Sequence, residues 1–440
     1  MFKNINCKNL PSLRRNIVYQ FLYELLIVFI PLFTIPYVSR VLGAENIGLF
    51  SYTYAVANYF VLFANLGIKN YGSRTIAMVR NNKEELNRNF SEILSIHIIF
   101  SIIVIFVYLV LLFFFVEDNL VIFLIQSIYV FAAVFDINWF FFGIEKFKLT
   151  VGRNTLVKIL SVFLVLVFVK TQTDLWIYAL ILALSVFVGQ SVVWFALKQY
   201  VSWRRPSWAN MKQHIRPLFV LFLPILALSL YKYMDKIMLG SISSNVQVGF
   251  YENAEKIINV PMSLIMAFGV VLMPRIANMV TSKDKGEVFK LIDMSMEAVM
   301  LLAIAISFGL AGISFVLAPI FFGYEFEECG ILIMGLAVTV PFMAFANVIR
   351  TQYLIPYKED KIFVVSLFLG AAVNLIVNII LIPYMAARGA VIGTIFAEII
   401  VCIYQSYFVR KKIFIKKYLL NTIPPILIGI VMFVFVFQIG

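Results

Sequence analysis

Apolar runs of about 20 residues recur along the whole of this 440-residue chain. Each run is long enough to cross a hydrocarbon core of roughly 30 Å as a helix. Only 13% of the residues are charged and 62% are hydrophobic, whereas a soluble domain is nearer a quarter charged. We therefore expect an all-α integral membrane protein without a soluble domain.

The apolar runs predict twelve membrane helices in two sets of six, followed by an additional helix near the C-terminal end. The first run continues without a small-residue cleavage site, so we interpret it as an uncleaved membrane helix. The expected bounds are 17–42, 47–68, 91–115, 120–142, 152–170, 175–199, 217–240, 249–274, 291–320, 329–353, 362–383, 389–409 and 420–438.

Positive charge alternates between the two sides of this helix set. Of the 36 lysines and arginines, 29 lie in the N-terminal segment and in every second connection. The intervening turns hold only Lys170 and Arg388. Cytoplasmic loops carry such an excess, so we expect a cytoplasmic N-terminus. These loops also account for the net charge of +13, and we expect no nucleic-acid partner.

Cofactor and catalytic signals are missing from the sequence. The three cysteines are far apart, the two histidines are too few for a metal cluster, and no P-loop occurs. No catalytic combination of His, Ser and Asp stands out. We expect neither an enzyme nor a bound cofactor or metal.

An internal repeat links the two sets of helices. Gly48 precedes Arg74 by 26 residues, and Gly249 precedes Arg275 by the same distance. An even number of helices per copy gives both copies the same orientation, a design typical of transporters that rock around a central site. The alternative is that the glycines merely end helices. We divide the chain into an N-terminal lobe (1–200), a basic linker (201–216), a C-terminal lobe (217–410) and an extra helix (411–440).

Short motifs in the same order resemble the Wzx-type polysaccharide flippases of the multidrug/oligosaccharidyl-lipid/polysaccharide (MOP) exporter superfamily. They cover nearly the whole chain, and each is weak when taken alone. The motifs are 34–43 with Gly48, 65–68, 71–74, 139–145, 231–240, 251–256, 273–275, 351–356, 370–374 and 389–394.

The resemblance implies two six-helix bundles related by pseudo-two-fold symmetry. It also implies transfer of undecaprenyl-pyrophosphate-linked oligosaccharides from the inner to the outer leaflet of the bacterial plasma membrane, by alternating access. The products become O-antigen, capsule or exopolysaccharide. Expected partners are this cargo, membrane lipids and the polysaccharide polymerase machinery. A proton or sodium gradient, or the membrane potential, would drive transport.

Three other functions are alternatives to this one. A MATE-like drug/cation antiporter should prefer acidic or apolar groups in its cleft. A membrane glycosyltransferase or polymerase should have a large external loop, and every external turn here is short. A peptidoglycan lipid precursor flippase has similar chemistry and is harder to exclude.

Charged residues inside spans are costly and mark functional candidates. Lysine and arginine can neutralise the cargo's phosphates, and tyrosines can contact its sugars. Alternatively, Lys232–Asp235 and Glu252–Lys256 are ion pairs on helix surfaces. The predicted cargo contacts, in a central cavity, are Arg40, Lys232, Lys236, Lys256, Asp235, Glu252, Tyr37 and Tyr231.

Two further groups of charged residues have other predicted roles. Arg74 and Arg275 are expected at the cytoplasmic mouth, as gate residues or topology anchors. Glu24, Asp136 and Glu398 lie within spans, where a carboxylate can bind a driving ion. Hydrogen bonding to neighbouring helices is the simpler interpretation of these three.

Overall fold

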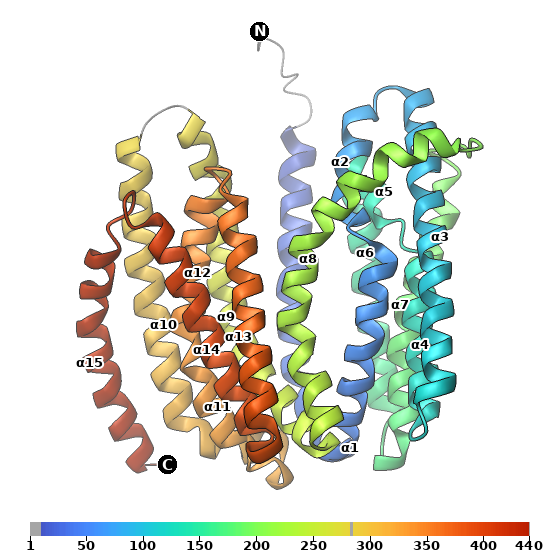
Figure 1. The fold of residues 1–440 in the computed structure, drawn as a ribbon. Helices are drawn as coiled ribbons and strands as arrows, with labels where there is room; N and C mark the ends of the chain where they lie inside the picture. The colour runs from blue at the N-terminus through green and yellow to red at the C-terminus, as the bar shows by residue number, and fades with distance from the viewer. Residues whose placement is uncertain (1–9, 282–284, 440) are drawn as a thin grey trace. The chain divides into compact units, whose positions relative to one another are not determined.

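A computed structural model describes residues 10–281 and 285–439 (Figure 1), and every regular element in these ranges is a helix. The all-α prediction is therefore confirmed. The elements are α1 (Leu10–Asn65), α2 (Ile68–Val79), α3 (Lys83–Phe115), α4 (Leu120–Val134), α5 (Asn138–Gly143), α6 (Phe147–Phe168), η2 (Gln172–Asp174), α7 (Leu175–Leu197), α8 (Trp208–Ile242), α9 (Asn245–Thr281), α10 (Lys285–Phe322), η3 (Tyr324–Phe326), α11 (Cys329–Ala337), α12 (Thr339–Ile349), η4 (Arg350–Leu354), α13 (Asp360–Met385), α14 (Ala387–Val409) and α15 (Ile415–Ile439).

Twelve helical stretches of the described chain are long and apolar enough to cross a membrane. The first, Leu32–Val79, contains a break at Gly43, whose φ of 76° and ψ of 172° are not helical. Figure 1 shows the two arms of α1 running in opposite directions. The break at Gly43 therefore separates the first two predicted spans, 17–42 and 47–68, although α1 holds most of both. The protein is a multi-pass membrane protein.

The chain forms two compact units. Unit 1 comprises Met1–Leu42 and Thr53–Leu226, and unit 2 comprises Gly43–Tyr52 and Ala227–Gly440. The boundary lies inside α8, later than the predicted linker at 201–216, and the second half of that linker is already helical.

Two glycines explain why the short segment Gly43–Tyr52 belongs to unit 2. A Cβ on Gly48 would lie 1.6 Å from the carbonyl oxygen of Asn245, and a Cβ on Gly249 would lie 2.1 Å from that of Ala44. No side chain fits at either position, because the obstacle is backbone. These are the glycines that the sequence repeat singled out, and the contact gives their presence a packing reason.

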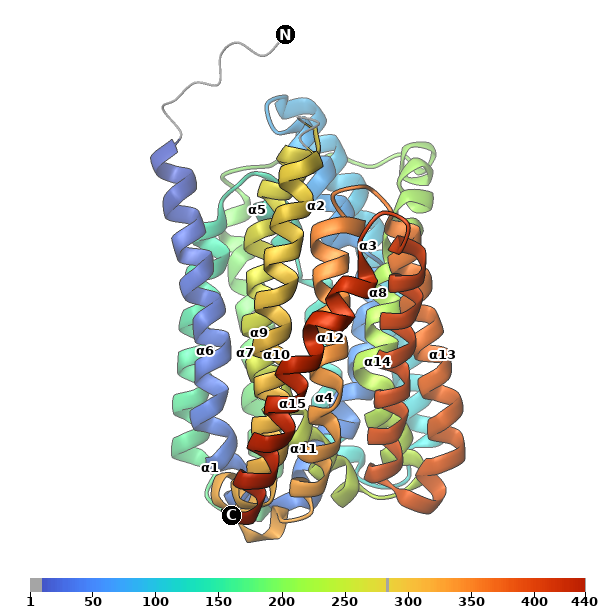
Figure 2. The ribbon, with the colours of Figure 1, turned by 90° about the vertical axis from the view of Figure 1, so that its left-hand side faces the viewer.

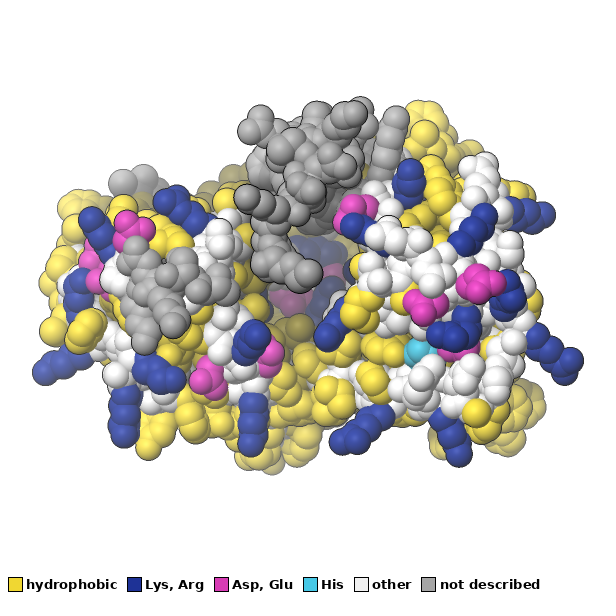
Figure 3. Space-filling model, turned by 90° about the horizontal axis from the view of Figure 1, so that it is seen from above, with side chains coloured by type: hydrophobic (Ala, Val, Ile, Leu, Met, Phe, Trp, Pro, Cys, Tyr) yellow, Lys and Arg dark blue, Asp and Glu magenta, His cyan; other side chains and the backbone are white. Residues whose placement is uncertain are grey.

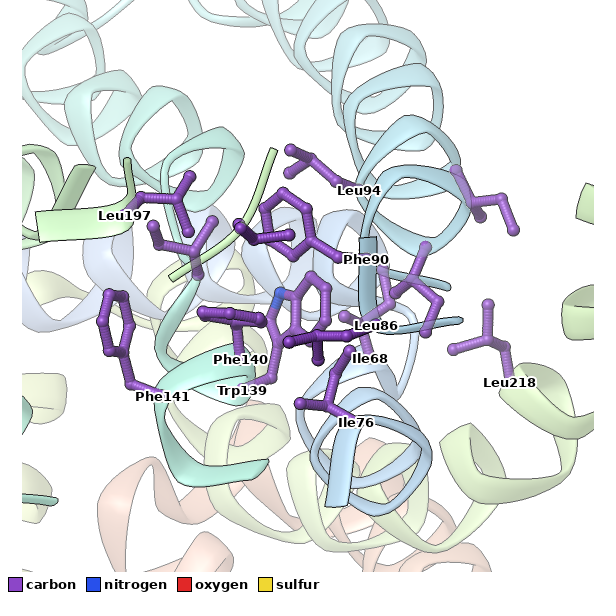
Figure 4. Packing of buried hydrophobic residues seen from close by; sticks show 14 of the residues in the cluster. Ile68, Ile76, Leu86, Phe90, Leu94, Trp139, Phe140, Phe141, Leu197 and Leu218 are labelled. Carbon is purple, nitrogen blue, oxygen red and sulfur yellow. The ribbon is translucent and has the colours of Figure 1, made fainter. Parts of the chain in front are cut away.

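Unit 1 has an aromatic core near the start of α3 (Figure 4). The ring of Trp139 stacks on Phe90 with their centroids 5.6 Å apart, and Phe140 meets Phe90 edge-on. Helix α2 turns Ile68 and Ile76 toward this core. The predicted spans 47–68 and 91–115 leave α2 in the connection between them. Its apolar residues occupy one face of a short helix, too few for a long apolar run.

Unit 2 includes the predicted additional helix, α15. Figure 2 shows α15 beside α10, and polar bonds join them near the start of α15. Lys417 lies 2.8 Å from Asp293, and the Asn421 amide donates to Glu297 over 2.8 Å. The thirteenth apolar run is thus a helix that packs on the unit.

Basic side chains gather at one end of each unit. In unit 1 the α2–α3 and α7–α8 connections lie at the basic end of that unit, and in unit 2 the starts of α13 and α15 lie at its own basic end. Figure 3 looks onto these ends and shows lysine and arginine side chains spread across their surface. One end of each unit is therefore richer in positive charge than the other, as the alternation of charge along the sequence predicts.

Candidate functional site

A charged cavity of about 440 Å³ lies within unit 2. Helices α8 and α9 contribute most of its charged residues, and α12, η4, α13 and α14 form the opposing walls. The lining residues are Leu228, Lys232, Lys236, Glu252, Glu255, Lys256, Asn259, Met266, Met343, Ala346, Asn347, Arg350, Phe363, Leu367, Glu398, Val401 and Gln405. Four predicted cargo contacts are among them.

An ion-pair network occupies the α8–α9 wall. The Lys236 ammonium lies 2.6 Å from Glu252 and 2.8 Å from Glu255, and the Lys256 ammonium lies 3.1 Å from Glu252. Lys236 is almost completely buried, with 7% of its surface exposed. Two lysines and two glutamates compensate each other here, so this network contributes little net charge to the cavity. The predicted alternative of a Glu252–Lys256 pair is confirmed.

Lys232 is different, because it is exposed on the cavity wall one turn before Lys236. Its ammonium lies 5.3 Å from the centroid of the Tyr233 ring, a distance typical of a cation–π contact. Its predicted pairing with Asp235 is absent from the ion pairs of the described residues, as Asp235 has other partners. Lys232 therefore presents its charge to the cavity.

Asp235 does not line the cavity, although the sequence placed it with Lys232 and Lys236. It is buried, and it accepts hydrogen bonds from Tyr251, Asn378 and Thr394. Neighbouring residues on a helix point about 100° apart, so Lys236 and Asp235 face different surroundings. Hydrogen bonds from three donors, on α9, α13 and α14, stabilise the buried Asp235 carboxylate. This cluster of oxygen-bearing groups connects the three helices.

Arg350 is a cavity residue that sequence analysis missed. The sequence analysis gave it no role in a site, yet it begins the π-helical turn η4 and lines the cavity. Its guanidinium carbon lies 5.3 Å from the centroid of the Phe363 ring. The sequence did contain a signal for Arg350, because it lies inside the predicted span 329–353 and a charged residue within a span marks a functional candidate. Glu398, a predicted ion-coupling residue, lines the same cavity.

Arg40 and Tyr37 belong to unit 1, outside this cavity. Arg40 is exposed. The Tyr37 hydroxyl donates to the carbonyl of Val169 over 2.7 Å and accepts from Lys170 over 3.3 Å. Tyr37 therefore joins α1 to the end of α6, and this bonding is consistent with a structural role.

The other predicted residues whose side chains are described do not line the cavity. Asp136 accepts two bonds from Asn138, over 3.0 Å and 2.7 Å, and so caps the start of α5. Arg74 and Arg275 are exposed on α2 and α9. The side chains of Glu24 and Tyr231 lie outside the described residues, although both positions are helical.

A second buried polar cluster lies in unit 1 and had no sequence prediction. The His214 Nε2 atom lies 2.9 Å from a carboxylate oxygen of Glu92, and its Nδ1 atom lies 2.6 Å from the Tyr71 hydroxyl. Both His214 and Glu92 are buried. This cluster joins the first part of α8 to α2 and α3.

Comparison with known proteins identifies the family. The model described as "Polysaccharide biosynthesis protein" matches residues 13–280, well over half of the chain. The chain belongs to this family. A candidate O-antigen transporter of Shigella dysenteriae is 24% identical to this polysaccharide biosynthesis family member over 408 residues, which cover 89% of the chain and 99% of the relative.

Solved structures establish the fold of this family member. The lipid II flippase MurJ in an inward closed conformation aligns with a TM-score of 0.74 at 15% identity, covering 96% of the chain and 97% of MurJ. A multidrug resistance MATE transporter of the MOP superfamily, in an inward-facing conformation, aligns with a TM-score of 0.67 at 14% identity, covering 89% and 97%. The chain has the MOP fold, and the resemblance to Wzx-type members of this superfamily is confirmed.

Proposed function

We propose that the protein is a flippase for undecaprenyl-pyrophosphate-linked oligosaccharides, moving them from the inner to the outer leaflet of the bacterial plasma membrane. The observation that carries this proposal is the unit 2 cavity, on whose wall Lys232 is exposed. A neutral drug needs no such cation, whereas a pyrophosphate crossing the bilayer requires neutralising charge. The family and the O-antigen transporter relative support a polysaccharide precursor as the cargo.

Each part of the cargo has a matching environment in this proposal. Lys232 neutralises the pyrophosphate as a point charge, and the prenyl tail stays in lipid. Alternating access moves the sugar between leaflets, with the N-terminus in the cytoplasm and the basic ends on that side.

Transport needs no cofactor in this proposal, and an ion gradient or the membrane potential drives it. Of the three predicted ion-coupling carboxylates we propose Glu398, because it lines the cavity that would hold the cargo. The released product would pass to the polysaccharide polymerase machinery. A MATE-like antiporter fits less well, because a cation substrate would be repelled by Lys232 and Arg350.

The test is deletion of the gene followed by analysis of lipid-linked sugars. We expect surface polysaccharide to disappear and the lipid-linked repeat unit to accumulate on the inner leaflet. Complementation with the wild-type gene should restore both. Normal polysaccharide in the deletion strain, or rescue of cells depleted of their peptidoglycan precursor flippase, would argue against this cargo.

A further inference from the structure

The walls of the unit 2 cavity differ in chemistry. The α8–α9 wall carries ammonium and carboxylate groups, as described above. The opposite wall carries two amides, a guanidinium and a carboxylate: Asn347 on α12, Arg350 at the start of η4, and Glu398 and Gln405 on α14. Amides add no charge, so they cannot neutralise a phosphate.

Three polar atoms on this second wall are buried without hydrogen-bond partners among the described residues. They are Nδ2 of Asn347, Nε of Arg350 and Oε1 of Gln405. Only 6% of Asn347 and 1% of Gln405 are exposed. Buried polar atoms are nearly always hydrogen-bonded in folded proteins. All three residues line the cavity, where a polar ligand can offer them partners.

Other bonds hold these side chains in place. The Gln405 amide nitrogen donates to the Ser366 hydroxyl over 2.9 Å, which leaves its oxygen as the remaining acceptor. The Asn347 oxygen lies 3.5 Å from the Arg350 guanidinium, which leaves the Asn347 nitrogen as a donor. The wall thus offers two donors, Asn347 Nδ2 and Arg350 Nε, together with one acceptor, Gln405 Oε1.

This combination suits a sugar ring. A hydroxyl group both donates and accepts, so it pairs with amides and carboxylates placed together. The Phe363 ring on the same cavity surface can cover an apolar face of the sugar. We propose that Asn347, Arg350 and Gln405 form a sugar subsite, which rests on the proposed function and assigns the glycan to the wall formed by α12, η4 and α14.

The test separates sugar recognition from pyrophosphate recognition. Purified protein in lipid nanodiscs is titrated with two probes: the lipid-linked repeat unit extracted from the deletion strain, and undecaprenyl pyrophosphate without sugar. The variants are Asn347→Leu and Gln405→Leu. The matched control is Gln352→Leu, because Gln352 is buried, has no partner for its amide among the described residues, and does not line the cavity.

We expect each cavity variant to bind the sugar-bearing probe about tenfold more weakly, because it loses a hydrogen bond to a buried polar group. Binding of undecaprenyl pyrophosphate should change less than twofold, and Gln352→Leu should bind both probes like wild type. Equal weakening for both probes, or no weakening, would overturn the sugar subsite. Failure of wild type to bind either probe would instead overturn the proposed function.

Discussion

The ammonium of Lys236 on α8 lies 2.6 Å from the carboxylate of Glu252 on α9, almost entirely shielded from solvent. This pair joins the two helices that carry most of the cavity's charge. Glu255 and Lys256 extend it into a four-member network. Lys236 therefore belongs to the scaffold of the cavity, whereas Lys232, one turn away, is available to a ligand.

Replacing Lys236 with Met should destabilise the protein. The substitution leaves two carboxylates close together with less positive charge, and breaking a buried ion pair costs about 3 kcal/mol or more. We expect a clear fall in the melting temperature of the detergent-purified protein. Adding Glu252→Gln to Lys236→Met should recover part of the loss. A melting temperature equal to that of wild type would show that the pair does not stabilise the unit.

Replacing Lys232 with Ala should impair transport without impairing folding. The residue is exposed and its removal leaves the Lys236 network intact, while the cargo loses one neutralising charge. We expect at least a tenfold drop in surface polysaccharide formed per molecule of protein in complemented deletion cells. Lys212→Ala, also on α8 and outside the cavity, serves as the control. Wild-type polysaccharide at equal expression would remove Lys232 from the site.

Substituting Gly48 with Ala should prevent normal packing of unit 2. The added Cβ would overlap the backbone carbonyl of Asn245, which no side-chain rotation can relieve. We expect little protein in the membrane fraction, or a greatly lowered melting temperature. Gly152→Ala is the matched control, because a Cβ there meets nothing within 4 Å. Similar yields for the two variants would contradict the proposed contact.

Changing Glu92 to Gln should loosen the first part of α8 from α2 and α3. The substitution weakens the bond to His214 in a buried setting, at a cost of about 1–3 kcal/mol. Limited proteolysis should then cut the 198–207 connection faster. Glu85→Gln, at an exposed position on the same helix, should leave the cleavage rate unchanged. Equal rates for the two variants would mean that the cluster does not hold α8.

The arrangement of spans could be predicted from the sequence, because apolar length and loop charge are local properties. The break at Gly43 and the extra helix α15 followed from the same pattern. Side-chain partners could not be predicted in this way. Asp235 and Lys236 are adjacent in the chain, yet one faces α13 and α14 while the other faces α9 and the cavity.

Arg350 shows a second limit of sequence reasoning. Arg350 stands at the end of an apolar run, and a cation in a cytoplasmic loop would stand there too. Only the fold shows that η4 turns it toward α14, where Glu398 and Gln405 line the same cavity. The amides of this wall had no sequence signal, because a polar residue in a span more often joins helices than binds a ligand.

The most direct test of the central claim uses purified protein in sealed proteoliposomes that contain the lipid-linked repeat unit in both leaflets. A membrane-impermeant reagent that oxidises sugars reports the fraction of cargo facing outward over time. With an imposed ion gradient, we predict that wild-type protein makes nearly all of the cargo accessible, whereas the Lys232→Ala variant leaves about half protected. A protected half that persists with wild-type protein under every gradient would contradict the account.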